Sequence, residues 1–135
     1  MHVIRHSAAI IVASICVAGS AAAQQMTGEE IRSFLSGKTA YVQTGTASAT
    51  GTIGEGAIYY GADGTGLYRT PTGAIWHGTW TVKDNKYCSE YKEGPKRPCG
   101  PFEKQGDTVV FIDGETGKVR IKITKTVPGN AENLK

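Results

Sequence analysis

The sequence predicts an all-β domain, folded as a small antiparallel meander barrel or strongly curved sheet of about eight strands with one short N-terminal helix. From residue 57 onward, short runs rich in Tyr, Trp, Val, Ile and Thr are separated by Gly, Pro or Asp-Gly, which are strand and turn signals. Most of these runs begin 8 to 13 residues apart. A parallel sheet would need helical crossovers of about a dozen residues or more between its strands, so antiparallel pairing is expected.

Residues 1–23 have the layout of a signal peptide. A basic head containing Arg5 leads into an apolar stretch over residues 7–18, and Ala21 and Ala23 occupy the two positions that a signal peptidase reads. We therefore predict cleavage after Ala23 and a periplasmic or secreted protein. The apolar stretch is shorter than the roughly 20 residues that cross a bilayer as a helix, so no transmembrane span is expected.

Removal of these 23 residues from the 135 leaves 112, which suits a single β-rich domain over residues 24–128 and a flexible polar tail at 129–135. Without Arg5, 14 basic residues face 12 acidic ones. This near balance favours neither a nucleic acid nor a strongly acidic partner.

Two cysteines remain after the signal peptide, Cys88 and Cys99, and we predict a disulfide between them. The alternatives are a metal site, which needs further His or Cys ligands, and a reactive thiol, which needs an activating base. The local sequence over residues 88–91 offers neither. Closing this short ring is expected to stabilise the fold by about 3 kcal/mol through chain entropy.

The short helix is predicted to begin at residues 27–30, Thr-Gly-Glu-Glu, which form a capping box. Ile31, Phe34 and Leu35 follow at helical spacing and make one apolar face. Ser-Gly at 36–37 ends the element. A helix of about two turns is not stable alone, so it must dock on the sheet.

Residues 45–56 contain small residues and few apolar anchors, and they predict a long mobile loop. The expected strands are residues 39–44, 57–60, 65–70, 74–82, 86–91, a weak 99–103, 107–113 and 117–126.

The strand over residues 74–82 alternates apolar and polar side chains, which places Trp76 and Trp80 on the inner face and His77 on the outer one. Together with Tyr68, the two tryptophans would line an apolar cavity, and we predict these three as ligand-binding residues. The alternative is a packed interior, because a barrel of this size is often filled by its own side chains.

The strand near the C-terminus alternates as well, with Val119, Ile121 and Ile123 predicted to face inward. The outward residues form a basic stripe, which would either attract an anionic partner or be a solvated face that discourages edge pairing. Its members are Lys118, Arg120 and Lys122.

His77 is the only histidine outside the signal peptide, and this constrains catalysis. A Ser/His/Asp triad or a histidine-ligated zinc would have to use it, yet no second ligand lies at metal spacing. We therefore predict no catalytic residue, no metal and no cofactor, and a protein that is not an enzyme.

The chain resembles an uncharacterised family of small secreted bacterial proteins. Members share a short helix with a Gly-Glu-Glu-Ile-like start, an Asp-Gly turn, a Gly-x-Trp-x-Val strand and a cysteine pair. The corresponding residues here are 28–31, 63–64, 78–82, Tyr87-Cys88, Cys99 and 106–108. The resemblance spans about residues 28–127, and it implies secretion but no known activity. The insert at residues 95–98, between the two cysteines, departs from the simplest form of the family pattern. The Gly-x-Trp strand also resembles the lipocalin and avidin type of ligand-binding barrel, where it lies on the first strand.

Together these observations predict a non-catalytic binding module that takes a small apolar ligand inside or a cell-envelope component outside, with no nucleic-acid partner. The alternative is an envelope interaction or inhibitor protein that acts through exposed loops at 45–56 and 89–98. A third hypothesis is a small hydrolytic enzyme that depends on His77.

Overall fold

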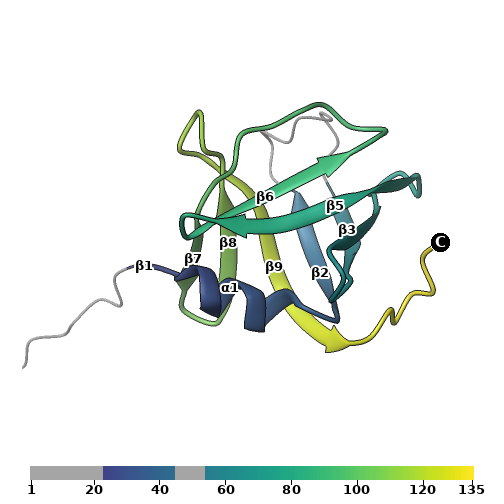
Figure 1. Ribbon diagram of the computed structural model, residues 1–135, viewed down its shortest axis with the longest axis horizontal. Helices are drawn as coiled ribbons and strands as arrows, with labels where there is room; N and C mark the ends of the chain where they lie inside the picture. The colour runs from purple at the N-terminus through teal and green to yellow at the C-terminus, as the bar shows by residue number, and fades with distance from the viewer. Residues whose placement is uncertain (1–22, 45–53) are drawn as a thin grey trace, which may run out of the picture.

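The structure is a computed structural model that describes residues 23–44 and 54–135, so the predicted signal peptide and residues 45–53 lie outside the described part. One antiparallel sheet curls into a half-barrel around an apolar interior, with a short helix packed in its hollow (Figure 1). This confirms the all-β curved sheet that the strand spacing predicts.

The elements in chain order are β1 (Gln24–Gln25), α1 (Gly28–Leu35), β2 (Lys38–Thr44), β3 (Gly54–Tyr60), β4 (Thr65–Arg69), β5 (Ile75–Lys83), β6 (Lys86–Tyr91), β7 (Phe102–Gln105), β8 (Thr108–Ile112) and β9 (Val119–Pro128). The sheet order is β1-β7-β8-β9-β2-β3-β4-β5-β6. Successive strands from β2 to β6, and from β7 to β9, are neighbours, and the return of β9 to the side of β2 joins these two meanders into one sheet.

The two ends of the sheet meet at a single point, between Tyr87 in β6 and Gly100 just before β7. The Tyr87 N–H donates to the Gly100 carbonyl at 2.8 Å, and the Gly100 N–H donates back at 3.0 Å. The predicted disulfide joins the adjacent residues Cys88 and Cys99, whose Cα atoms are 4.4 Å apart. The disulfide therefore closes the curled sheet covalently at the place where only one pair of residues joins its edges by backbone hydrogen bonds.

The N-terminal helix is capped as its sequence predicts. The Glu30 N–H donates to the Thr27 hydroxyl oxygen at 3.2 Å, and the Thr27 N–H donates to the Glu30 carboxylate at 2.9 Å. Ile31 and Leu35, one turn apart, have no exposed surface. They enter the hollow of the sheet, where α1 contacts β2, β5 and β6.

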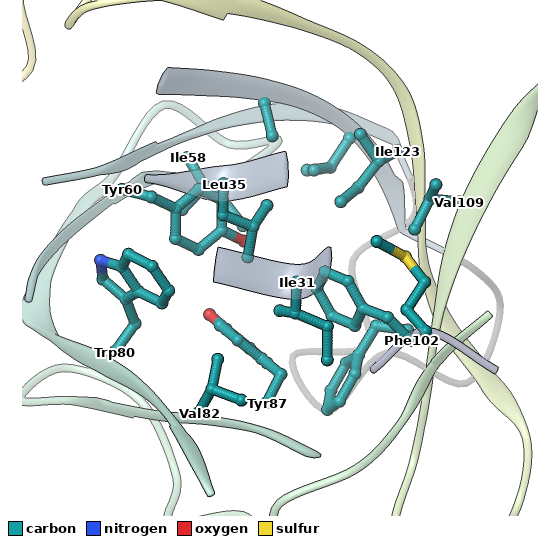
Figure 2. Close-up of a cluster of buried hydrophobic side chains, with 14 of the residues drawn as sticks. Ile31, Leu35, Ile58, Tyr60, Trp80, Val82, Tyr87, Phe102, Val109 and Ile123 are labelled. Atoms are coloured by element: carbon teal, nitrogen blue, oxygen red, sulfur yellow. The ribbon is translucent and has the colours of Figure 1, made fainter. Parts of the chain in front are cut away.

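The interior next to α1 is a packed apolar core (Figure 2). The rings of Tyr60 and Trp80 meet edge to face, with centroids 5.5 Å apart, and Tyr87 makes a similar contact with Tyr60 at 5.9 Å. The Trp80 indole N–H donates to the Gly61 carbonyl at 2.9 Å, which satisfies its one polar group. This part of the barrel is filled by its own side chains.

Strand β3 begins three residues earlier than the sequence predicts, which corrects the end of the expected loop at 45–56. Residues 54–56 pair with residues 42–44 of β2. These residues are Gly-Glu-Gly, which carry little strand signal, but the ladder is made by backbone groups and does not need strand-favouring side chains.

The C-terminal segment at 129–135, whose polar composition predicts flexibility, makes specific contacts with the body of the domain. The Ala131 N–H donates to the Thr39 hydroxyl oxygen at 3.0 Å, and the Gly129 N–H donates to the Gly37 carbonyl at 2.8 Å. Leu134 is only 6% exposed. The segment is held by backbone hydrogen bonds and one apolar anchor, which composition alone does not reveal.

Candidate functional site

A cavity of about 60 Å³ lies inside the curl, beside the packed core. Its walls come from β3, β4, β5, β6, β8, β9 and the loop between the disulfide cysteines. The lining residues are Ile58, Tyr68, Trp76, Tyr87, Ser89, Tyr91, Pro95, Arg97, Phe111, Arg120 and Ile121. None of them comes from α1, so the helix fills one part of the interior and leaves this part to the cavity. Four further hollows on the described surface are more open to solvent than this cavity.

One wall of the cavity is made of three aromatic rings from neighbouring strands. Tyr68 in β4 is the register partner of Trp76 in β5, and their rings meet edge to face with centroids 5.6 Å apart. The Tyr91 ring in β6 lies 6.0 Å from that of Tyr68 and 6.2 Å from that of Trp76. Such a wall offers flat apolar surface to a ligand.

Glycine allows the loop and the neighbouring strand to approach this wall closely. A Cβ atom on Gly94 would lie 2.5 Å from the Trp76 ring, and one on Gly78 would overlap the backbone of Glu90 in β6. The glycine of the Gly-x-Trp pattern therefore permits close pairing of β5 with β6.

The structure brings two of the three predicted ligand-binding residues together and separates the third. Tyr68 and Trp76 line the cavity, whereas Trp80 lies in the packed core. Both tryptophans point inward, as alternation predicts. Trp76 and Trp80 are four residues apart in β5, and because the strand curls they lie in different parts of the interior. Alternation predicts that both side chains face inward but not which part of the interior each one reaches.

Arg120 faces the cavity, which corrects its predicted place in the outward basic stripe. Phe111 in β8 pairs with Ile121, and the next residue, Ile112, pairs with Val119, so Arg120 is an extra residue in β9. This β-bulge turns the Arg120 side chain toward the interior, because two residues of β9 lie opposite one residue of β8 at that point. The Arg120 side chain is only 14% exposed, and Val119, predicted to face inward, is 41% exposed.

Two guanidinium groups meet one carboxylate at the edge of the cavity. Asp113 Oδ2 lies 3.6 Å from Arg120 Nε and 3.8 Å from Arg97 Nη1, distances of ion pairs rather than hydrogen bonds. The other oxygen, Asp113 Oδ1, accepts the backbone N–H groups of Glu115 and Thr116 at 2.9 and 3.0 Å. These bonds hold the pKa of Asp113 below its usual range, so it is ionised.

Two polar atoms of the lining residues are buried without a hydrogen-bond partner among the described residues, namely Arg120 Nε and the Tyr91 hydroxyl. Burial raises the pKa of Tyr91 well above its usual value, so its hydroxyl keeps its proton. Burial, with the nearby charge of Arg97, lowers the pKa of Arg120 to about 10, which still leaves it charged at neutral pH. Arg120 Nε therefore carries a hydrogen that it has not donated, whereas the Tyr91 hydroxyl lies close to that of Tyr87, whose interaction with it contributes to the raised pKa of Tyr91.

The sequence predicts neither arginine as a residue of the cavity, although it places Arg120 in an outward basic stripe that could attract an anionic partner. Strict alternation assigns Arg120 to the wrong face, and only the bulge corrects it. Arg97 lies in the short ring closed by the disulfide, between Pro95 and Pro98. Such a constrained segment is a weak signal of a positioned side chain. Within the same loop, Lys96 is fully solvated and makes only a long ion pair of 3.9 Å with Glu90.

His77 lies on the outer face, as predicted, with its side chain 44% exposed. Its Nδ1 lies 2.7 Å from Glu93 Oε1, and its Nε2 lies 3.0 Å from the Lys135 carbonyl oxygen. The hydrogen bond to Glu93, and then the one to Lys135, raises the pKa of His77. The histidine thus joins the disulfide loop to the C-terminal segment.

Among residues 23–44 and 54–135, no group of three or more His, Cys, Asp or Glu side chains is placed to hold a metal ion. No helix in the same ranges is long and apolar enough to cross a membrane. Comparison of the chain with known protein families, with curated proteins and with solved structures finds no match.

Proposed function

We propose that the protein is a non-catalytic binding module that takes one small, partly apolar ligand into the cavity between the aromatic wall and Arg120. The observation that supports this is the contrast between the two parts of the interior. One part is packed to completion, whereas the other keeps about 60 Å³ of space beside two buried polar groups without partners. Buried donors are normally satisfied, so a cavity lined by Arg120, whose buried Nε has no hydrogen-bond partner among the described residues, suits a ligand that accepts hydrogen bonds.

We further infer that the module acts outside the cytoplasm, in the periplasm or as a secreted protein. The layout of residues 1–23 supports this, because it combines a basic head, a short apolar run and small residues before Gln24. The disulfide between Cys88 and Cys99 supports it as well, since such bonds persist in oxidising compartments.

The volume of the cavity limits the size of the ligand. One water molecule needs about 10–15 Å³ of such space, so the cavity admits about four to six non-hydrogen atoms. Very small ligands gain at most about 1.5 kcal/mol per non-hydrogen atom, which gives a ligand of about five atoms a Kd in the micromolar range at best. Binding assays therefore need ligand concentrations from micromolar to millimolar.

The two tryptophans provide a test with an internal control. In a ¹H–¹⁵N spectrum of the intact protein, the Trp76 indole signal reports the cavity and the Trp80 signal reports the packed core. Titration with four- to six-atom acids, amides and alcohols is expected to give saturable shifts at Trp76 for at least one compound and little change at Trp80. If every compound leaves Trp76 unshifted, or shifts both indoles alike without saturation, the proposed function is refuted.

A pair of variants at Ser89 shows whether the cavity itself binds. Ser89→Leu fills the space between the rings and is expected to abolish the Trp76 shift, whereas Ser89→Ala leaves the cavity open and keeps it. Ser89 is the register partner of Trp80, so the Trp80 signal is expected to move in both variants, and an unchanged circular dichroism spectrum shows that each variant is folded. Equal binding by both variants would place the ligand elsewhere.

A further inference from the structure

We propose that the ligand of this cavity is a short-chain carboxylate, whose oxygens accept hydrogen bonds from Arg120 beside Arg97 while its alkyl chain lies against the Trp76 ring. This inference rests on the proposed function and names the chemical class of its ligand. Three features of the cavity support a carboxylate ligand: its charge, its free hydrogen-bond donor and its apolar wall.

The charge at the cavity is unbalanced toward positive. Arg97 and Arg120 both lie near Asp113, so two guanidinium groups share one carboxylate. One oxygen of that carboxylate is already occupied by two backbone N–H groups of its own turn. The remaining oxygen is too distant from either arginine for a hydrogen bond. An anion that enters the cavity would therefore meet a net positive charge inside walls of low polarity, where attraction is strong.

The free hydrogen-bonding groups are donors. Arg120 Nε and the Tyr91 hydroxyl are both buried, and neither has a hydrogen-bond partner among the described residues, although Arg120 Nε lies 3.6 Å from Asp113 Oδ2. The Arg120 guanidinium lies over the Phe111 ring, 5.5 Å from its centroid, which holds the planar fork in place. A carboxylate accepts two parallel hydrogen bonds from such a fork, whereas an amine ligand would add a charge of the same sign.

The apolar wall distinguishes a carboxylate from an inorganic anion. Tyr68, Trp76 and Tyr91 present ring surface in the same cavity as the arginines, and this surface gains nothing from a fully hydrated phosphate ion. A chain of two or three carbons would cover it. Propionate has five non-hydrogen atoms and butyrate has six, so both fall within the size that the cavity admits.

Butyrate and butyramide form a matched pair for the test, because they have the same number of non-hydrogen atoms and nearly the same shape but differ in charge. Both are titrated into the intact protein at constant ionic strength and neutral pH, with the Trp76 and Trp80 indole signals as the readout. We expect the Kd of butyrate to be at least tenfold lower than that of butyramide. Inorganic phosphate, titrated in the same way, is expected to bind more weakly than butyrate.

The outcomes separate this inference from the proposed function. Equal affinities for butyrate and butyramide would overturn the carboxylate inference and leave the binding module standing. Phosphate binding as tight as that of butyrate would overturn it too, by showing a general anion site. If neither organic compound nor any other small ligand shifts Trp76, both proposals fail.

Variants identify the arginine that carries the selectivity. Arg120→Met keeps an unbranched apolar stem and removes the guanidinium with its charge, and it is expected to weaken butyrate binding at least tenfold while butyramide binding stays within twofold. Lys122→Met removes a charge from the exposed part of the same strand and is expected to change neither. If Arg120→Met fails to fold, as judged from the Trp80 signal, Arg97→Met in the loop provides the same comparison. Unchanged butyrate affinity in folded arginine variants would overturn the inference.

Discussion

Removal of the disulfide between Cys88 and Cys99 is expected to destabilise the domain strongly, because it closes the curl at the point where the sheet edges meet through one bridge only. The two cysteines are 11 positions apart, so the closed ring holds 12 residues. Loop-closure entropy for this length is about 9.5 cal/mol/K, or about 2.8 kcal/mol at 25 °C. With about 2.1 cal/mol/K of unfolding entropy per residue over roughly 110 residues, the Tm should fall by about 12 °C.

The assay is thermal unfolding of the protein that begins at Gln24 and of its double variant Cys88→Ser/Cys99→Ser, followed by circular dichroism with and without a reductant. The reductant should lower the Tm of the wild-type protein to that of the variant and leave the variant unchanged. A fall of less than about 3 °C would refute the reasoning, because it would mean that the unfolded chain gains little freedom when the ring opens.

Three further predictions address the helix, the strand pairing and the outer histidine. Ile31→Ala deletes a fully buried side chain of α1 and should lower the free energy of unfolding by about 2–5 kcal/mol in a urea titration; a loss below 1 kcal/mol would show that the helix is not docked. Gly78→Ala places a Cβ against the backbone of Glu90 and should destabilise the domain by more than the exposed substitution Glu90→Ala, also measured in urea. The ion pair of His77 with Glu93 stabilises the protonated histidine, so its contribution is complete below pH 6.5 and is lost as the pH rises through the raised pKa. In an NMR titration the pKa of His77 should lie above 6.5 and fall in the Glu93→Gln variant, and an unchanged pKa would contradict the pairing.

Most of the fold follows from local sequence patterns because hydrophobic alternation, turn residues and spacing all agree. The capping box at residue 27, the strand over residues 86–91 and the cysteine pair are recognisable without any tertiary information. The sequence predicts the fold less well where a segment is held in place by backbone hydrogen bonds rather than by its side chains. The first residues of β3 are Gly-Glu-Gly and carry no apolar pattern, and the C-terminal segment is anchored by main-chain hydrogen bonds.

The candidate site is predictable only in part for the same reason. Tyr68 and Trp76 are large aromatic residues on adjacent strands, and alternation alone directs them inward. Arg120 reaches the cavity through a bulge, and a bulge shifts the pattern by one residue without a distinct residue type to mark it. Arg97 depends on the path of the disulfide loop. The charged half of the site therefore requires three-dimensional information that the sequence does not display.

A crystal structure of the protein, from crystals grown in the presence of butyrate, tests the central claim most directly, because it observes the bulge, the cavity and its contents together. The expected result is Arg120 turned into the curl, with a carboxylate bound to its guanidinium and an alkyl chain against Trp76. The account is contradicted if Arg120 lies on the outer face in regular register with β8, or if side chains fill the space between Trp76 and Phe111.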